Sequence, residues 1–277
     1  MKSKLSTMIL VIILIIGVSL LLYPSASNYW NSLHQSRLIA SYADAIVHID
    51  DNQYAALWDS ARVYNQFLAD EGNLWIMTDQ QRDDYRNQLK IPGGIISCIE
   101  IPRIHCQLPV YHGTSDAVLQ VAIGHMEGSS LPVGGPSTHC VVSGHRGLPS
   151  AQLFSRLDQM EVGDVFYLQT LDEILTYEVE QILIVLPHEM EYLEIQEGRD
   201  LCTLVTCTPY GVNSHRLLVR GHRIETKQAD VVRRISADAR QIEPKAVAPI
   251  LALPLLTLLL IPLFWPRKRR KSRDIQH

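Results

Sequence analysis

The sequence predicts a mainly β fold: a closed barrel with short helices, preceded by N-terminal helices and flanked by two transmembrane helices. Three observations lead to this prediction. Short β-branched or alternating runs, bounded by Pro, Gly, Asn and Asp, fill the middle of the chain. Long uncharged apolar segments stand near both ends. A helical repeat of apolar residues precedes the β-rich region.

The composition excludes several classes of protein. The 277 residues are 47% hydrophobic and 19% charged, which rules out a disordered chain. The formal net charge of −4 gives no support to nucleic-acid binding, so no nucleic-acid partner is expected. The five cysteines include no CxxC spacing, which argues against a zinc ribbon and against a dense disulfide framework. These exclusions leave a membrane-tethered globular protein.

Residues 1–24 are expected to form an N-terminal membrane anchor. Leu5–Tyr23 carries no charge, and its length is close to the roughly 20 apolar residues that a membrane-spanning helix needs. A cleaved signal peptide is the alternative, with Ser25-Ala-Ser27 as a weak cleavage site. The length of the apolar run favours a retained anchor.

A second membrane span is expected at residues 246–266, after a linker over residues 227–245. Ala246–Trp265 contains no charge, and a basic tail over residues 267–277 follows it. A buried hairpin is the weaker alternative, because the segment carries no charge and a basic cluster flanks it. The prolines of this segment are tolerated within a membrane. Positive charges stay on the cytoplasmic side, so both termini are placed in the cytoplasm and the region between the spans on the extracellular face of the cell membrane.

Residues 25–90 are expected to be a helical segment that precedes the barrel. Ser36–Asp70 is predicted to be helical, because apolar residues repeat with the spacing of one buried stripe at Tyr54, Leu57, Trp58, Ala61, Tyr64 and Leu68. These side chains are expected to dock on the domain. Residues 71–89 are polar apart from the apolar stretch Leu74-Trp-Ile-Met77, which needs a surface to pack on.

The barrel is predicted over residues 91–226. Its expected strands are Ile95–Glu100, Ile104–Tyr111, Thr138–Ser143, Asp164–Gln169, Ile174–Leu186, Cys202–Cys207 and His215–Ile224. Brief helical patterns stand at Val118–Gly124 and Leu153–Met160. Many strands with few, short helices favour a closed or nearly closed barrel.

Chemistry-bearing side chains stand near the ends of three predicted strands. Cys207 and Arg216 lie on consecutive strands across a Pro-Tyr-Gly turn, so their side chains are expected to meet on one surface. A thiolate attacks carbonyl groups, and an imidazole such as that of His145 supplies or removes the proton. A guanidinium keeps its charge and can stabilise an oxyanion. From residue types alone this signal is modest, since single cysteines are more often buried hydrophobes.

Three stretches of the chain resemble the sortases, which are cysteine transpeptidases on the outer face of Gram-positive bacteria. These stretches are LPVYHGT, SGHRGLP and TLVTCTPYGVNSHRLLVRGHR, which follow one another in the family's order over about residues 93–225. The last is most similar to class C, the pilin-polymerising branch. A second apolar span at the C-terminus also resembles that class. The resemblance implies a sortase-type barrel.

The resemblance implies three catalytic residues. Cys207 would be the nucleophile, which cleaves an LPxTG-type sorting signal between Thr and Gly and forms a thioacyl enzyme. His145 would protonate the leaving amine and then deprotonate the incoming one. Arg216, rather than Arg220 or Arg223, matches the family arginine because it directly follows Asn-x-His.

The resemblance also implies the partners. Thr206 and Thr208 would shape the substrate groove, although a plain structural place in a strand explains them as well. The substrates would be surface or pilin proteins, and the acceptor amine a pilin lysine, which gives an isopeptide-linked polymer. A peptidoglycan precursor as the acceptor is the close alternative. A catalytically silent membrane scaffold that binds sorting signals is a weaker one. No metal or organic cofactor is expected.

Class C sortases carry a lid upstream of the barrel, with an Asp-Pro-aromatic motif. Residues 71–89 occupy the corresponding place but contain no Asp-Pro pair, and Trp75 and Asp79 are the available aromatic and acid. We expect Leu74–Met77 to fold over the groove of Cys207. The alternative is a linker whose apolar stretch packs elsewhere.

Two further cysteines precede the proposed catalytic residues by the same five positions, Cys140 before His145 and Cys202 before Cys207. An odd offset reverses the face of a regular strand, so both thiols are expected to point away from the site. If the two strands are neighbours, these thiols approach one another. Buried free thiols are expected, with a disulfide here or between Cys98 and Cys106 as the alternative.

Overall fold

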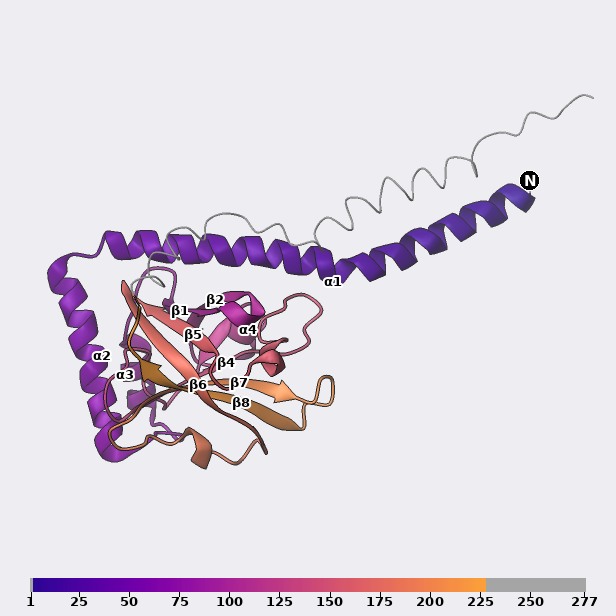
Figure 1. The fold of residues 1–277 in the computed structure, drawn as a ribbon. Coiled ribbons are helices and arrows are strands. Elements are labelled where there is room, and N and C mark those ends of the chain that lie inside the picture. Colours follow the sequence, from indigo (N-terminus) through magenta and orange to yellow (C-terminus); the bar gives the residue numbers. More distant parts are fainter. Residues whose placement is uncertain (1, 228–277) are drawn as a thin grey trace, which may run out of the picture. The chain divides into compact units, whose positions relative to one another are not determined.

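The computed structural model describes residues 2–227, with side chains from Ser6 onward. The chain divides into two compact units, and the larger one, which begins at Ser27, contains the barrel. Three helices come before the first strand: α1 (Lys2–Val47), α2 (Asp51–Glu71) and α3 (Asp79–Asn87) (Figure 1). The predicted linker, second span and basic tail lie outside the described residues, apart from the first position of the linker.

Eight strands in the described part of the chain close into a barrel, which confirms the predicted architecture. Their order around the barrel is β1-β2-β3-β4-β7-β8-β6-β5, and β1 pairs with β5 to close it (Figure 1). Neighbours are antiparallel except for the parallel pairs β2–β3 and β4–β7. The strands are β1 (Ile95–Ile101), β2 (Cys106–His112), β3 (Ile123–His125), β4 (Thr138–Ser143), β5 (Val165–Thr170), β6 (Glu173–Val185), β7 (Asp200–Thr208) and β8 (His215–Ile224).

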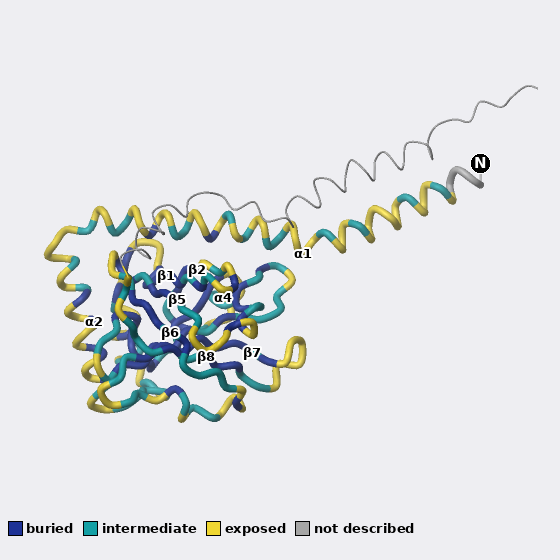
Figure 2. Tube along the Cα trace, in the orientation of Figure 1, coloured by how far each residue is buried: buried dark blue, intermediate teal, exposed yellow. Residues whose placement is uncertain are grey.

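Buried side chains form two groups, on opposite faces of the strands. The main core contains Val142, Leu204 and Val219 among many others, and Figure 2 shows the buried positions concentrated in the barrel. Alternate residues of a strand face opposite sides, so their neighbours along β4, β7 and β8 point the other way. Those neighbours belong to a smaller group, here called the outer-face cluster, which consists of Val141, Val185, Leu193, Val205 and Leu218.

The first helix meets the requirements of a membrane span. Ser6–Val47 contains a stretch with a mean hydropathy of 2.7, none of which is buried. It is the one helix in residues 2–227 that is long and apolar enough to cross a membrane.

Further along α1, within the larger unit, Asn31 Nδ2 donates to the Ser150 carbonyl at 2.6 Å, and Gln35 Nε2 donates to the Val121 carbonyl at 3.0 Å. The second half of α1 is therefore attached to the barrel.

The predicted helix over Ser36–Asp70 is interrupted, which corrects the expectation. α1 ends at Val47, and Asp50 caps α2 by accepting a hydrogen bond from the Gln53 amide at 2.9 Å. An aspartate at this position satisfies an amide that has no partner within the helix, so it starts a new helix. The predicted apolar stripe is confirmed, since Trp58, Ala61, Tyr64 and Leu68 are buried against the barrel core.

Two local expectations are wrong in the β-rich region. The helical pattern at Val118–Gly124 resolves into a single turn, α4 (Asp116–Leu119), and the short strand β3. Three residues are too few to show the alternation that identifies a strand. The second strand begins at Cys106 rather than Ile104, because Pro102–Ile104 form a 3-10 turn and His105 adopts a left-handed conformation with φ of 51°. Two other 3-10 turns are η2 (Leu157–Gln159) and η3 (Glu191–Leu193).

Candidate active site

Cys207 and Arg216 are directly paired across the antiparallel ladder of β7 and β8. Opposite residues in such a ladder project to the same face, with their Cβ atoms about 5 Å apart. Both residues are half-buried, so neither belongs to the barrel interior. The structure therefore brings the predicted nucleophile and the predicted arginine together, as the turn between their strands led us to expect.

His145 reaches the same end of the barrel through the parallel pair β4 and β7. The last pair of that ladder joins Ser143 to Val205, and the Gly144 amide extends it by donating to the Val205 carbonyl at 3.0 Å. β4 ends at Ser143, so His145 stands two residues past the paired ladder, and Cys207 is the residue that the same register would set opposite it. His145, like Cys207, is half-buried. The thiol and the guanidinium thus come from paired strands, and the imidazole comes from the loop that follows β4.

The turn between β7 and β8 orients the Arg216 guanidinium. Its Nη1 donates to the carbonyls of Asn213, at 3.2 Å, and of His215, at 3.1 Å. Asn213 adopts a left-handed conformation with φ of 58°, which an asparagine tolerates, and this folds the turn back onto the arginine. A guanidinium has five N–H donors, so others remain for an oxyanion or a peptide carbonyl.

Thr206 and Thr208 flank the cysteine but point away from its face. They are only 1% and 7% exposed. Thr206 Oγ1 donates to the Gly144 carbonyl at 2.7 Å, and Thr208 Oγ1 accepts from Arg146 Nη1 at 3.2 Å. This placement favours the structural explanation of the two threonines over the expected role in lining the groove. Their hydroxyl groups connect β7, the strand of Cys207, to residues 144–147, which are here called the histidine loop.

Trp75 packs on the face of the sheet that carries Cys207 and Arg216. It contacts the outer-face cluster, in which Val205 lies two residues before Cys207 and Leu218 two residues after Arg216. Residues two apart on a strand share a face. The apolar side chains of Leu74 and Met77 pack instead against the main core, while Ile76 is 93% exposed. Within the stretch Leu74–Met77, only Trp75 therefore packs on the sheet face of Cys207, whereas Leu74 and Met77 pack elsewhere.

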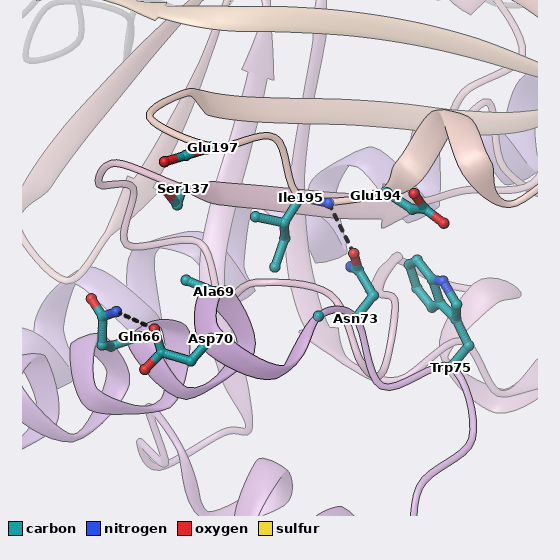
Figure 3. Close-up of a pocket in the computed structure, with 10 residues that line it drawn as sticks. Gln66, Ala69, Asp70, Asn73, Trp75, Ser137, Glu194, Ile195 and Glu197 are labelled. Carbon is teal, nitrogen blue, oxygen red and sulfur yellow. Dashed lines mark hydrogen bonds between the residues drawn. The ribbon is translucent and has the colours of Figure 1, made fainter.

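Backbone and side-chain contacts fasten this segment on both sides. The Leu74 amide donates to the Gly128 carbonyl at 3.0 Å, and Asn73 Oδ1 accepts from the Ile195 amide at 2.9 Å. Figure 3 shows Asn73 reaching the connection between β6 and β7, with Trp75 beside it. A pocket of about 690 Å³ opens between this connection and the end of α2, and Trp75 forms part of its wall.

Asp79, the other lid candidate, is not placed over the site. It is the first residue of α3, its side chain is fully exposed, and its carboxylate contacts Arg82 at 3.3 Å. Thr78 caps the helix in a reciprocal capping box with Gln81. The aspartate thus serves the start of a helix, where a negative charge is stabilising, rather than the catalytic groove.

The odd offsets predicted that two of the remaining cysteines, Cys140 and Cys202, point away from the candidate site. Cys140 and Cys202 are directly paired in the β4–β7 ladder, and both are buried in the main core. Burial raises the pKa of the Cys140 thiol, but hydrogen bonds to Cys202 and His125 outweigh it and lower the pKa to about 6. No disulfide joins any of the five cysteines, all of which lie in the described residues. Cys98 and Cys106 are not opposite one another, since Cys98 pairs with Pro109.

His139 is a buried residue whose importance the sequence did not reveal. Its Nδ1 lies 2.8 Å from the Glu194 carbonyl, and its Nε2 lies 2.7 Å from Thr203 Oγ1. Burial lowers its pKa to about 4, so the ring is neutral near pH 7 and Nδ1 carries the proton that the carbonyl accepts. His139 thereby attaches the β6–β7 connection to β4. A single histidine in a strand gives no sequence signal for such a role.

The fold defines a closed β-barrel protein with a candidate cysteine–histidine–arginine site, and known proteins share this fold. A sortase domain model matches residues 99–224. Sortase C1 from Streptococcus agalactiae superposes with a TM-score of 0.68 and 52% identity, over 69% of this chain and 100% of that one. Sortase C from Streptococcus pneumoniae gives 0.63 and 44%, over 69% and 97%.

Curated relatives show the same relationship. Sortase A from Streptococcus agalactiae is 32% identical over 117 residues, which are 41% of this chain and 47% of that protein. The chain thus spans about half the length of this curated relative. On these matches, the chain belongs to the sortase family, whose members are cysteine transpeptidases.

Proposed function

We propose that this protein is a membrane-anchored transpeptidase in which Cys207 cleaves an LPxTG-type sorting signal between Thr and Gly. The observation that carries the proposal is the pairing of Cys207 with Arg216, together with the β4–β7 register that leads to His145. The Cys207 sulfur attacks the threonine carbonyl carbon, and a tetrahedral oxyanion forms. The free guanidinium donors of Arg216 are placed to stabilise that charge. His145 protonates the departing glycine amine, which leaves a thioacyl enzyme.

The second half of the reaction transfers the acyl group to an amine. His145 removes a proton from the incoming amine, whose nitrogen attacks the thioacyl carbon and releases the Cys207 thiol. Amine must outcompete water at this step, which a sheltered groove favours. Trp75, over the sheet face that carries Cys207, supports such shelter.

A pilin lysine is the acceptor that we propose, with an isopeptide-linked polymer as the product. The support is the similarity to sortases C, of which the one from Streptococcus pneumoniae shows pilin substrate specificity. Transfer to a peptidoglycan precursor is the alternative outcome of the test below. Pilin and other surface proteins with sorting signals are the proposed partners.

The proposed location is the cell membrane. α1 supplies one candidate span, and the uncharged segment 246–266 supplies a second in the sequence, followed by a basic tail. Both termini would then face the cytoplasm and the barrel the cell exterior. This arrangement would keep the barrel close to substrates that emerge from the same membrane.

The lid is proposed to regulate access to Cys207 through Trp75. Its support is the packing of Trp75 on the outer-face cluster and the hydrogen bonds of the neighbouring Asn73 and Leu74. Opening would require those few contacts to break, while α3 stays attached to β3 through Tyr85, whose hydroxyl lies 2.8 Å from His125 Nδ1. The hinge would then lie between Trp75 and the start of α3.

The test supplies the full chain, in detergent micelles, with an LPxTG peptide and two competing acceptors. One acceptor is a lysine-containing pilin peptide and the other a peptidoglycan-precursor analogue with a free amine. We expect an isopeptide product with the lysine peptide, identified by tandem mass spectrometry and missing with Cys207→Ala. Preferential transfer to the precursor would replace the pilin assignment. Binding of the LPxTG peptide without any cleavage would favour a non-catalytic scaffold.

A further inference from the structure

Arg146 follows the candidate general acid–base residue directly, yet its side chain does not face the substrate. Only 10% of the Arg146 side chain is exposed to solvent. Its Nη2 contacts the Asp158 carboxylate at 2.5 Å, and its Nη1 donates to Thr208 Oγ1 at 3.2 Å. A buried guanidinium that is held in this way acts within the protein rather than on a ligand.

The two partners of Arg146 tie together separate parts of the fold. Thr208 is the residue after Cys207 at the end of β7, and Asp158 belongs to the 3-10 turn η2. Arg146 therefore connects the histidine loop to the cysteine strand on one side and to η2 on the other. A guanidinium that contacts two residues through separate N–H donors restrains both of them, which a single hydrogen bond does not do.

A second hydrogen bond joins the same two segments on the other side of the catalytic pair. Thr206, the residue before Cys207, donates to the carbonyl of Gly144, the residue before His145, at 2.7 Å. The residues that flank the histidine thus bind the residues that flank the cysteine. Because successive residues of β7 alternate between faces, Thr206 and Thr208 make these contacts on one side while Cys207 projects to the other.

The histidine loop is also held from the side of η2. The Phe154 amide donates to the His145 carbonyl at 3.2 Å, and the Gly147 amide donates to Ser155 Oγ at 2.9 Å. A Cβ at Gly144 would come within 2.5 Å of Ile123 and 2.9 Å of Phe154, so the backbone there is tightly enclosed. Arg146 adds the contact with β7 that lies after His145, whereas the Gly144 amide and carbonyl make the contacts that lie before it.

We propose that Arg146 is a positioning residue, which holds the His145 imidazole against the Cys207 sulfur through its contacts with Thr208 and Asp158. The inference rests on the proposed roles of Cys207 and His145. Arg146 touches neither the substrate nor the reacting atoms. Its effect is on the alignment of the proton transfer, where a displacement of about 1 Å costs on the order of a hundredfold in rate.

The test compares variants that remove or keep one hydrogen bond. Thr208→Val keeps the shape of the side chain and loses the hydroxyl, whereas Thr208→Ser keeps the hydroxyl. We expect kcat to fall about tenfold to a hundredfold in Thr208→Val and Arg146→Met, with KM within about twofold, and Thr208→Ser to stay close to wild type. The double variant Arg146→Met with Thr208→Val should be no slower than the slower single variant.

A matched control removes another arginine–carboxylate pair nearby. Arg103 Nη2 contacts Glu161 at 2.7 Å, just beyond η2, but reaches neither His145 nor Thr208 by any contact in residues 2–227. Arg103→Met should therefore keep the wild-type kcat. Full activity in folded Thr208→Val and Arg146→Met, or losses that multiply in the double variant, would overturn the proposal.

A readout without substrate separates this inference from the proposed function. The rate of Cys207 alkylation by iodoacetamide at one fixed pH needs no substrate and responds to an imidazole that faces the thiol. We expect Arg146→Met and Thr208→Val to move this rate toward that of His145→Ala. An unchanged rate would reject the positioning role even if the wild-type enzyme transfers sorting signals. A changed rate in an enzyme that forms no thioacyl product would reject the function and retain the alignment.

Discussion

Cys140 of β4 and Cys202 of β7 are paired side by side in the barrel core, five residues before His145 and Cys207. The same register, continued past the end of β4 at Ser143, leads from the two thiols to the two candidate catalytic residues. The odd offset places the thiol pair on the inner face and Cys207 on the outer face. This arrangement gives each cysteine a distinct chemical environment that alkylation can detect.

Native alkylation should distinguish the buried cysteines from Cys207. A thiol reacts with a soluble reagent only where the reagent can reach it. Cys140 lies in the core beside Cys202. It is only 2% exposed, and Cys202 is 0% exposed, whereas Cys207 is half-buried. We expect iodoacetamide to modify Cys207 in the native protein and to spare Cys140 and Cys202. Peptide mapping by mass spectrometry measures this, and equal labelling of Cys140 would contradict the placement in the core.

Removal of the Trp75 ring should expose the Cys207 thiol. Trp75→Ala takes away a side chain that packs over the sheet face of Cys207, so we expect alkylation of Cys207 to become several-fold faster than in wild type. Ile76→Ala is the matched control, because this neighbouring side chain is 93% exposed and covers nothing. Equal rates in wild type and Trp75→Ala would remove the lid proposal without affecting the proposed chemistry.

Replacement of Arg216 should lower the chemical rate rather than the fold's stability. Arg216→Ala removes the donors placed for the oxyanion, and kcat should fall by about 10²–10³. Lysine lacks the planar fork, so Arg216→Lys should recover only a part. Arg220 lies on β8, like Arg216, and its Nε contacts the Glu180 carboxylate of β6 at 3.0 Å. Arg220→Ala should therefore reduce thermal stability while the folded fraction keeps its kcat. Similar kcat losses in both variants would argue against a special role for Arg216.

Acid should weaken the fold through its buried histidines. Burial lowers the pKa of His139, and of His112, from 6.5 to about 4. The unfolded chain therefore binds more protons between those values, and stability should fall as the pH drops from about 6.5 to 4, by at most about 3 kcal/mol for His139.

Chemical denaturation at both pH values measures this loss. His139→Gln should show a smaller loss than wild type, because the buried group no longer titrates. The exposed His188 supplies the control, and His188→Gln should keep the wild-type pH dependence. An unchanged loss in His139→Gln would show that this histidine contributes nothing to the acid sensitivity.

Much of the barrel follows from local patterns in the sequence. Thr138–Ser143 and His215–Ile224 have the predicted bounds, because alternation and flanking turn residues mark their ends. The three-residue β3 and the cap at Asp50 were missed, since a very short strand has no period and a capping aspartate looks like any polar residue. Tertiary pairing, rather than local preference, decides such elements.

The site was predictable only in part, for a similar reason. The odd offset from Cys140 to His145 and from Cys202 to Cys207 was informative, because strand geometry converts spacing into faces. The packing of Trp75 and the exposure of Asp79 depend on how residues 71–89 dock on distant strands. Arg146 gave no signal of its own, because its partners Thr208 and Asp158 are brought to it only by the fold.

The most direct test of the central claim is to trap the thioacyl intermediate. The full chain is mixed with an LPxTG peptide in the absence of an acceptor amine, quenched with acid, and analysed by intact mass and peptide mapping. The account predicts an adduct on Cys207 that ends at the threonine, accumulates more slowly in His145→Ala and Arg216→Ala, and is missing in Cys207→Ala. An adduct on another residue, or peptide cleavage that persists in Cys207→Ala, would contradict it.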